Sequence, residues 1–547
     1  MDKKSSVEPD QARAVEPAPS RSPGEKSPAS TRDLDDAYEL YRQQDAQDLD
    51  PQEARQVLRR IDWHLLPLLM GTYMLQYLDK SSINFASVFG LQKGTHLQGQ
   101  EWYVSRNVIV CPGTAGYILE TWTKSTNMTP FHTIDSWLSS IFYIGYLVAQ
   151  PLAGFLLQRL PVGKFIGSTA LGNLVWGMLT ITTPACTNFA GIAANRFLLG
   201  CFEAVVNPGF VLVLSMWYRQ DEQPMRMVTY YCMNGVAGIF GGLLGYAIGH
   251  ITSGLQPWQY IFIIFGSISL AWGIVFLIFM PDLPTTARYL NGRQRIVAVE
   301  RVTMNRQGVK NHHYKAYQLR QCLLDPKTWI LFIMSVAAQI PNAAQSTFTS
   351  IILETFGFDV LQAQYMQIPG NVIQIGSLLA SGWISSRFPN MRCAVMLVSN
   401  LICVGAGAAL VGSPPGPDGT DNKWGRLVAL WLCSFTSVGF SMSLTMVSSN
   451  VAGYTKKQVT GAILFIGYCV GNVRVNALWR FRILIGYTAK TVMVIVLYMY
   501  MWSVNKKRDR EASITGSHLT EEQEKEAIEK GMLDMTELDN KGFRYVL

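Results

Sequence analysis

An arginine and a glutamate stand seven residues apart in the apolar stretch Arg196-Phe-Leu-Leu-Gly200-Cys-Phe-Glu203. Seven residues at about 100° each amount to about 700°, so in a helix both side chains lie on one face, two turns apart. Asp79 and Lys80 form a second charged pair in another apolar run. A charge near the bilayer centre costs at least about 2.5 kcal/mol, so these residues should face a partnered or water-filled interior. Two acids and two bases in this setting indicate a path for a proton and an anion.

The two acids are the candidate proton-coupling residues. Burial disfavours the charged form of a carboxylate and a nearby cation favours it. Asp79 or Glu203, balanced between these effects, could take a proton from one side of the membrane and release it to the other. The alternative is a static ion pair that only holds two helices together.

The two bases are candidate substrate-binding residues. Arg196 offers a planar fork that matches a carboxylate, whereas Lys80 is a compact point charge. Each base could instead pair with an acid nearby, Arg196 with Glu203 and Lys80 with Asp79. The two interpretations are compatible, because a substrate carboxylate can displace an internal acid once that acid is protonated. Such an exchange would link anion binding to proton binding.

Uncharged amides in the apolar runs are the candidates for selectivity. A buried amide needs hydrogen-bond partners, so each one either contacts the substrate or joins two helices. The candidate substrate-binding amides are Gln150, Asn234, Asn342, Gln345, Gln367 and Asn371.

Twelve apolar runs must position these residues. They fall at 64–88, 136–158, 163–184, 188–215, 225–251, 258–281, 328–353, 361–386, 391–412, 426–449, 457–473 and 487–503. Each approaches the roughly 20 residues that a helix needs to cross the hydrocarbon, although the last two runs are short. The polar segment 282–327 separates six runs from six, which is the layout of two parallel repeats. The sequence therefore predicts an all-α polytopic membrane protein.

The charges follow the same division. Of the 547 residues, 49% are hydrophobic and only 15% are charged, against about 25% in a soluble domain. The charged residues crowd into a mostly disordered tail at 1–62, a central loop at 282–327 and a second tail at 504–547. The formal net charge of +8 could suggest nucleic acid. Because the basic residues lie beside apolar runs, orientation in a lipid bilayer explains them better, and no nucleic-acid partner is expected.

Basic residues also predict which side each loop faces. The loops that follow even-numbered runs carry Arg159, Lys164, Arg219, Arg226, Arg387, Arg392, Lys456 and Lys457, and the opposite loops at 185–187, 252–257 and 354–360 carry none. Cytoplasmic loops are the ones enriched in Lys and Arg. Both termini are therefore predicted to be cytoplasmic.

Other kinds of chemistry find no support in the sequence. The nine cysteines are scattered, with no CxxC pair and no metal-ligand spacing, so neither a metal nor a cofactor is expected. Catalytic Ser/His/Asp or Cys/His constellations are not discernible, and there is no ATP-binding P-loop. An enzyme is not expected, and energy should come from an ion gradient.

Several stretches resemble a known family. They are Arg60-Ile-Asp-Trp-His64, Leu75-Gln-Tyr-Leu-Asp-Lys80, Ser136-Trp-Leu-Ser-Ser-Ile-Phe-Tyr-Ile-Gly-Tyr146, Arg196 to Glu203, Ser215-Met-Trp-Tyr218, Pro281-Asp-Leu-Pro284, Asn450-Val-Ala-Gly-Tyr-Thr-Lys-Lys457, Leu464-Phe-Ile-Gly-Tyr-Cys-Val-Gly-Asn472 and Asn540-Lys-Gly-Phe-Arg-Tyr545. Together they resemble the major facilitator superfamily and, within it, the anion:cation symporters of the fungal allantoate permease type. The resemblance covers about residues 50–103, 135–473 and 487–547.

The resemblance implies both a fold and an activity. The fold would be twelve helices in two six-helix bundles, at 63–281 and 328–503, that rock about a central site. Relatives carry allantoate, ureidosuccinate, nicotinate, pantothenate, biotin or other small carboxylates, and acids at the positions of Asp79 and Glu203 couple protons. It thus implies a plasma-membrane monomer that takes up a small organic anion with protons. A metabolite exporter and a non-transporting nutrient sensor remain the alternatives.

The loop between the second and third runs carries a further signature of this family. It reads Gly154-Phe-Leu-Leu-Gln-Arg159-Leu-Pro-Val-Gly163-Lys164. The resemblance makes Gly154, Arg159, Gly163 and Lys164 candidates for conformational gating, because this loop clamps the inward-closed state in relatives. Gln158 stands where most of the superfamily has an acid.

Two segments depart from the family pattern. Residues 104–135 form an atypical insertion in the first outside loop, and they contain the glycosylation sequon Asn127-Met-Thr129. Residues 473–486 replace a longer outside loop and place Arg474, Arg480 and Arg482 on the side that should be poor in them. Our hypothesis is that both are retained introns or errors of the gene model; a tolerated surface insertion is the alternative.

Overall fold

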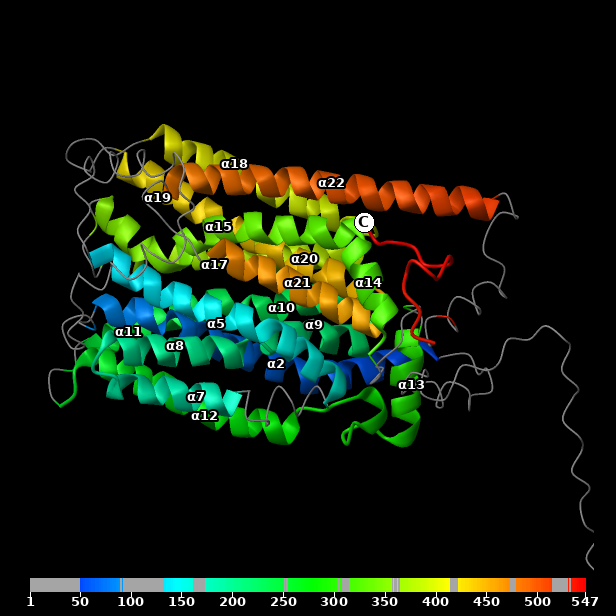
Figure 1. Ribbon diagram of the computed structural model, residues 1–547, viewed down its shortest axis with the longest axis horizontal. Helices are drawn as coiled ribbons and strands as arrows, with labels where there is room; N and C mark the ends of the chain where they lie inside the picture. The colour runs from blue at the N-terminus through cyan, green and yellow to red at the C-terminus, as the bar shows by residue number, and fades with distance from the viewer. Residues whose placement is uncertain are drawn as a thin grey trace, which may run out of the picture.

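The computed structural model describes residues 50–88, 91, 131–160, 173–249, 251, 254–303, 305, 314–356, 358, 362, 365–413, 422–472, 479–513, 530 and 533–547. Their regular secondary structure is helical throughout, and the long helices run side by side (Figure 1). Of the insertion at 104–135, residues 131–135 belong to a described helix, while residues 104–130 and residues 473–478 lie outside the described residues.

The first six spans precede the central segment. They are α2 (Pro51–Val88); α5 (Phe131–Arg159); α7 (Asn173–Thr182) with η3 (Thr183–Ala185); α8 (Phe189–Glu203) continued by α9 (Val206–Trp217); α10 (Gln223–Tyr231) continued by α11 (Met233–Gly249); and α12 (Pro257–Phe279). The central segment contains η4 (Pro284–Thr286), α13 (Gly292–Thr303) and α14 (Ala316–Leu324).

Six more spans follow. They are α15 (Pro326–Thr355); α17 (Ile368–Arg387); α18 (Arg392–Gly412); α19 (Lys423–Leu432), η5 (Cys433–Phe435) and α20 (Thr436–Asn450); α21 (Tyr454–Asn472); and α22 (Trp479–Ser513). Local signals set some of these boundaries. Asn188 caps α8 by accepting a hydrogen bond from the Gly191 amide, and Gln256 and Gln259 form a capping box at the start of α12.

One predicted boundary is wrong. We expected the last span at 487–503, preceded by the atypical segment 473–486 in place of a longer outside loop, yet α22 begins at Trp479. Ile483 is fully buried in a cluster with Cys403 and Ala406 of α18. Residues 479–486 therefore lengthen the last helix, and Ile483 packs against α18 within the second bundle.

Length and composition alone identify fewer spans than the fold contains. Seven helices of the described chain are long and apolar enough to cross a membrane, or eight if α14 and α15, bent by 65°, form one span. α2 misses this test because its interior carries charged and polar side chains, and α21 carries Lys456 and Lys457 in its first turn. Polar residues that face an interior lower the hydropathy of a helix that still spans.

The helices pack as two bundles that meet along two seams. In the first half α2 contacts α11 and α12, α5 contacts α8, and α7 contacts α12; in the second, α15 contacts α21 and α22, and α18 contacts α20 and α22. Between the halves, α5 packs on α21, and α10 and α11 pack on α17. These are the second span with the eleventh and the fifth with the eighth. Spans six places apart are equivalent in two related repeats, so the second span corresponds to the eighth and the eleventh to the fifth. The two seams are therefore equivalent contacts, as expected for such repeats.

A glycine allows the closest approach of α5 and α8. Gly200 lies between Arg196 and Glu203, and a Cβ there would overlap the Phe142 carbonyl oxygen of α5. Small residues let the backbones of membrane helices approach in this way. The contact fixes the face of α8 that carries both charged side chains.

The two ends of the bundle differ. α13, α14 and the last segment, 533–547, lie at one end, where α2 begins and α22 ends (Figure 1). We call this the α13 end.

Candidate functional site: a polar cavity between the two halves

A cavity of about 150 Å³ lies between the two bundles. The first half contributes residues of α2, α8, α9, α10 and α11, and the second contributes residues of α15, α17, α19, α20 and α21. Its polar lining residues include Gln76, Lys80, Glu203, Asn207, Asn234, Asn342, Gln345, Gln367, Asn371, Gln374, Ser437 and Tyr468. Lys80 is the one cation and Glu203 the one acid among the described residues that line it.

Lys80 is held by tyrosines of two other helices. Its Nζ donates a 2.6 Å hydrogen bond to the hydroxyl of Tyr468 on α21. The same ammonium lies 4.8 Å from the ring centroid of Tyr143 on α5 and 5.2 Å from that of Tyr468. Aromatic faces attract a cation without neutralising it. The ammonium therefore keeps its positive charge available to the cavity.

Glu203 reaches the cavity from the last residue of α8. Its side chain is buried, and Oε1 accepts a 2.8 Å hydrogen bond from the Gln76 amide of α2. The helix is interrupted at Ala204 and Val205 before α9 begins. Because the partner is neutral, the charge on this carboxylate is not balanced within the pair.

Asp79 lies beside the cavity rather than in its lining. The carboxyl is 1% exposed, and Oδ2 accepts hydrogen bonds from the indole of Trp176 and from Ser269 Oγ, the latter at 2.5 Å. Oδ1 has no hydrogen-bond partner among the described residues. The side chain joins α2 to α7 and α12 through neutral donors.

Arg196 is buried behind Asp79. One guanidinium nitrogen lies 3.3 Å from Ser82 Oγ, and Ser82 donates to the Asp79 backbone oxygen at 2.6 Å. The guanidinium also lies 5.4 Å from the ring centroid of Phe262. Arg196 is thus connected to Asp79 through Ser82, and it is not among the residues that line the cavity.

The four charged side chains do not form the static pairs that we considered. Among the described residues their hydrogen-bond partners are neutral: Trp176 and Ser269 for Asp79, Gln76 for Glu203, Tyr468 for Lys80, and Ser82 for Arg196. Buried charges with neutral partners are costly, and in membrane proteins they mark ion or substrate pathways.

Five of the six predicted amides line the cavity: Asn234, Asn342, Gln345, Gln367 and Asn371. Two of these also bond within the second half, Asn342 to Gln339 at 2.8 Å and Gln345 to the Leu430 oxygen at 3.5 Å. Gln150 lies apart. It is fully buried and its Nε2 lies 3.4 Å from the Ala204 oxygen, at the interruption between α8 and α9. Gln150 therefore joins helices, which was its alternative role.

Sequence reasoning missed several lining residues. Gln76, Asn207 and Gln374 are amides in apolar runs, the same signal that identified the other amides. Tyr231 and Tyr468 also line the cavity, and tyrosines in an apolar run give no sign of which ones face it.

Lys490 of α22 is a further buried cation that the sequence analysis overlooked. It is 0% exposed, and its Nζ donates to the backbone oxygen of Thr436 at 3.0 Å and to its hydroxyl at 3.4 Å. Thr436 lines the cavity, and Gly439 leaves room for the ammonium, because a Cβ there would overlap it. Lys490 thus lies directly behind the cavity wall, with neutral partners.

The predicted gating residues are described only in part. Arg159 is exposed at the end of α5, with its guanidinium 4.3 Å from the Phe155 ring centroid. At Gly154 a Cβ would meet nothing within 4 Å. Gly163 and Lys164 lie outside the described residues.

Hydrogen bonds between the halves close the α13 end. The hydroxyls of Ser448 and Ser449 on α20 donate to Gln223 Oε1 at 2.8 and 2.7 Å. Gln220 Nε2 donates to the Ser449 oxygen at 3.0 Å, and the Arg392 guanidinium donates to the Gln220 oxygen. We call these five residues the gate. Ser448 lies about 12 Å along α20 from Phe440, which lines the cavity.

The described residues contain no group of three or more His, Cys, Asp or Glu side chains suited to a metal. A sequence model described as Major Facilitator Superfamily matches residues 69–473. The chain belongs to this superfamily. It is a multi-pass membrane transporter and not an enzyme.

Relatives of this facilitator include both characterised and uncharacterised transporters. An uncharacterized transporter of Schizosaccharomyces pombe is 34% identical over 77% of this chain and 71% of its own. An allantoate permease of Saccharomyces cerevisiae is 27% identical over 94% of this chain and 90% of its own. Among solved structures, the proton:xylose symporter XylE bound to 6-bromo-6-deoxy-D-glucose superposes with a TM-score of 0.57. It is 13% identical, over 80% of this chain and 94% of that one, and shows the shared facilitator fold.

Proposed function

We propose that this transporter takes up a small organic anion together with protons by alternating access. The observation that carries the proposal is the cavity lining, in which Lys80 and Glu203 are the one cation and the one acid among the described residues, the others being uncharged. An ammonium in a partly desolvated cavity attracts a carboxylate. Lys80 is the proposed anion receptor.

Charge balance explains why a proton should travel with the anion. The described lining of the cavity carries one positive and one negative side chain. An anion alone would leave it with one excess negative charge, which is costly at this depth. A proton on Glu203 restores neutrality, so the anion and the proton bind together more favourably than either does alone. Glu203 is the proposed coupling residue.

Asp79 and Arg196 have a supporting role in this proposal. Among the described residues, one carboxyl oxygen of Asp79 has no hydrogen-bond partner, and Arg196 is linked to the Asp79 backbone oxygen through Ser82. This pair offers a second place for a proton, near the cavity but out of direct substrate contact. We retain Asp79 as a coupling residue, and Arg196 as a residue that affects binding through the local charge.

The amides favour a substrate with both donors and acceptors. Each Asn or Gln side chain offers two N–H donors and an acceptor oxygen. A ureide such as allantoate presents carbonyl oxygens, N–H groups and one carboxylate, which matches this lining and Lys80. The allantoate permease relative supports the same substrate class. A nicotinate- or pantothenate-like carboxylate is the second candidate.

Alternating access requires the two halves to move as units. We propose that 63–281 rocks against 328–503, with the gate closed in the present conformation. Arg159 and Lys164 belong to loops rich in basic residues, so we place the α13 end and both termini in the cytoplasm, at the plasma membrane. Gly154 and Gly163 would allow the loop between the second and third spans to change its contacts.

Uptake of radiolabelled allantoate tests this function. Cells without their own permeases would express the chain, or a version without residues 104–135, and uptake would be normalised to surface protein at pH 5 and pH 7.5. Unlabelled nicotinate, pantothenate, biotin and ureidosuccinate serve as competitors. Faster uptake at pH 5 that a protonophore abolishes is the expected result. Surface expression without uptake of any of these compounds would favour export or sensing.

A further inference from the structure

The segment 533–547 lies across the α13 end of the second half (Figure 1). It includes Asn540-Lys-Gly-Phe-Arg-Tyr545, for which the transport mechanism has no role. Its side chains Asp534, Thr536, Glu537, Asn540, Phe543 and Tyr545 are each at most 2% exposed. This segment is built into the bundle, and its polar side chains must have specific partners.

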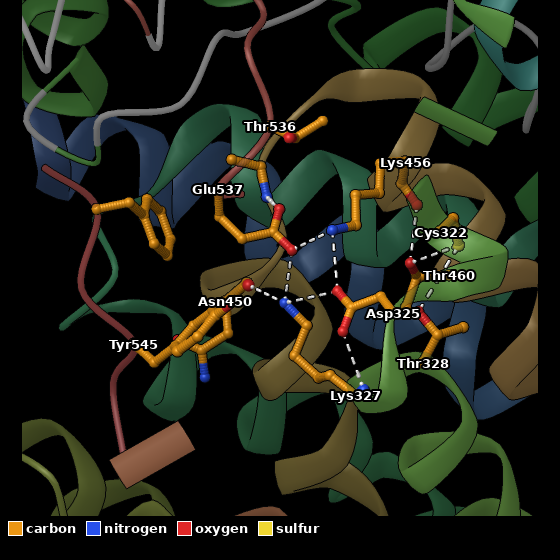
Figure 2. A network of polar contacts seen from close by, with 12 residues as sticks. Cys322, Asp325, Lys327, Thr328, Asn450, Lys456, Thr460, Thr536, Glu537 and Tyr545 are labelled. Atoms are coloured by element: carbon orange, nitrogen blue, oxygen red, sulfur yellow. Dashed lines mark hydrogen bonds and ion pairs between the residues drawn. The ribbon is translucent and has the colours of Figure 1, made fainter. Parts of the chain in front are cut away.

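Glu537 joins the first turns of two spanning helices (Figure 2). Its Oε1 lies 2.7 Å from Lys327 Nζ on α15 and 2.5 Å from Lys456 Nζ on α21. Its Oε2 accepts a 2.9 Å hydrogen bond from the Ala452 amide. Asp325 completes the group, 2.9 Å from the Lys456 ammonium.

These four charges balance one another. The side chains of Lys327, Lys456, Asp325 and Glu537 are each at most 1% exposed. Burial opposes ionisation of the Glu537 carboxyl, but the two ammonium groups outweigh this and lower its pKa. Removing one member of a buried ion pair leaves a buried charge without compensation, which is strongly unfavourable. Glu537 therefore holds the segment firmly against α15 and α21.

The end of the segment holds two other parts of the second half. Asn450 forms a pair of 2.8 Å hydrogen bonds with the backbone N–H and oxygen of Val546. The Leu547 amide donates to Asn390 Oδ1 at 3.2 Å, and the Arg392 amide donates to the Leu547 oxygen at 3.1 Å. The last residues of α20 and the first of α18 are thereby tied together.

The end of α20 and the start of α18 also provide the second-half residues of the gate. Asn450 directly follows Ser448 and Ser449, which bond to Gln223. The side chain of Arg392, whose backbone binds Leu547, donates to the Gln220 oxygen. The described hydrogen bonds of the segment run to α14 of the central segment, to residues of the second half and to the end of α22. It can therefore position the gate without spanning the two halves.

We propose that residues 533–547 form a strap that stabilises the conformation closed at the α13 end, with Glu537 as its positioning residue. The strap orients Arg392 and residues 448–450 so that they meet Gln220 and Gln223 at once. When the strap is released, these groups lose their fixed positions and the gate opens more readily. This inference rests on alternating access, but on no particular substrate.

Distances across the α13 end test the strap. Spin labels would be placed at the exposed positions Gln56 on α2 and Lys507 on α22, with Cys111, Cys186 and Cys201 replaced by serine. The full chain would be measured in lipid nanodiscs by double electron–electron resonance, without substrate. Glu537→Gln should raise the ratio of open to closed populations about tenfold or more. A distribution identical to that of the unsubstituted chain would overturn the proposal.

Two further variants complete the test. Asp539→Asn changes a strap carboxylate that bonds to Gln321 and Thr536, outside the Lys327 and Lys456 group, and it should leave the distances unchanged. If Glu537→Gln does not fold, deletion of residues 546–547 leaves Glu537 in place and removes the Asn450 and Arg392 contacts. It should shift the distances in the same direction, and its failure to do so would refute the strap. Because no substrate is present, these outcomes are independent of the proposed transport activity.

Discussion

Lys80 on the first span donates a 2.6 Å hydrogen bond to Tyr468 on the eleventh, so the cation of the cavity is held by the opposite half of the transporter. A substrate carboxylate that binds Lys80 must share or replace this bond. Substrate binding and the contact between the halves are therefore linked at one atom. The linkage gives the first prediction.

Lys80→Met should weaken binding of the transported anion about tenfold to a hundredfold, because a charge-assisted hydrogen bond contributes about 1.5–3 kcal/mol. Tyr468→Phe should change affinity by about threefold or less, since the ammonium remains. Substrate-induced protection against heat unfolding measures both affinities in purified protein. Equal loss in the two variants would mean that the tyrosine, rather than the charge, binds the anion.

Glu203→Gln should abolish accumulation driven by a proton gradient and preserve exchange of labelled for unlabelled substrate. The amide fills the same volume and can still bond to Gln76, but it cannot carry a proton. Proteoliposomes with and without a pH gradient measure the two activities. Accumulation at the normal level would remove Glu203 from the coupling mechanism.

Much of this arrangement was predictable from local patterns. Apolar runs of spanning length predicted the helices. Lys80 and Glu203 stood out as candidate functional residues because a charge inside a bilayer is costly and is therefore rare without a function. The same rule applied to Lys490, in the run 487–503, would have found that residue as well.

The partners of these residues were not predictable. A helix face specifies which residues lie together on one helix, but not the neighbouring helix or its register. Arg196 and Glu203 share a face of α8, yet one lies behind Asp79 and the other in the cavity. Gln150 and Asn234 are both amides in apolar runs, and only Asn234 lines the cavity. Burial of Glu537 in a polar tail gave no local signal, because its two lysines are distant in sequence.

Lys490→Met should weaken binding of an anionic substrate and leave an uncharged analogue unaffected. Thr436 separates the ammonium from the cavity. At that distance the attraction between the ammonium and a bound anion contributes about 1 kcal/mol to binding, or about fivefold in affinity. Competition of allantoate uptake by nicotinate and by nicotinamide compares the two charge states. Lys506→Gln, an exposed position on the same helix, is the control. A similar change for both competitors would indicate a purely structural role.

Gly200→Val should disrupt the contact between α5 and α8 and lower the amount of folded protein severalfold. The added side chain would overlap the Phe142 carbonyl, and backbone cannot move aside as a flexible side chain can. Fluorescence-detected size-exclusion chromatography measures the folded fraction. Gly154→Ala, where a Cβ meets nothing within 4 Å, should leave that fraction unchanged.

Glu537→Gln should lower the melting temperature at neutral pH, and the difference from the unsubstituted protein should shrink in acid. The folded-state pKa of Glu537 is lowered, so its contribution to the free energy of unfolding is complete above the ordinary carboxyl pKa. It is lost as the pH falls from there through the lower folded-state value. Breaking such a buried pair costs about 3–5 kcal/mol. Melting curves of the detergent-solubilised protein from pH 7 downwards measure this dependence.

The double variant Glu537→Gln with Lys456→Gln separates charge from packing. Glu537→Gln alone leaves Lys327 and Lys456 to share the single carboxylate of Asp325, with one buried positive charge in excess. The second substitution removes that excess, so the double variant should melt at a higher temperature than Glu537→Gln alone. If the two losses instead add, the charges act independently and Glu537 stabilises the strap through its Ala452 hydrogen bond and its packing.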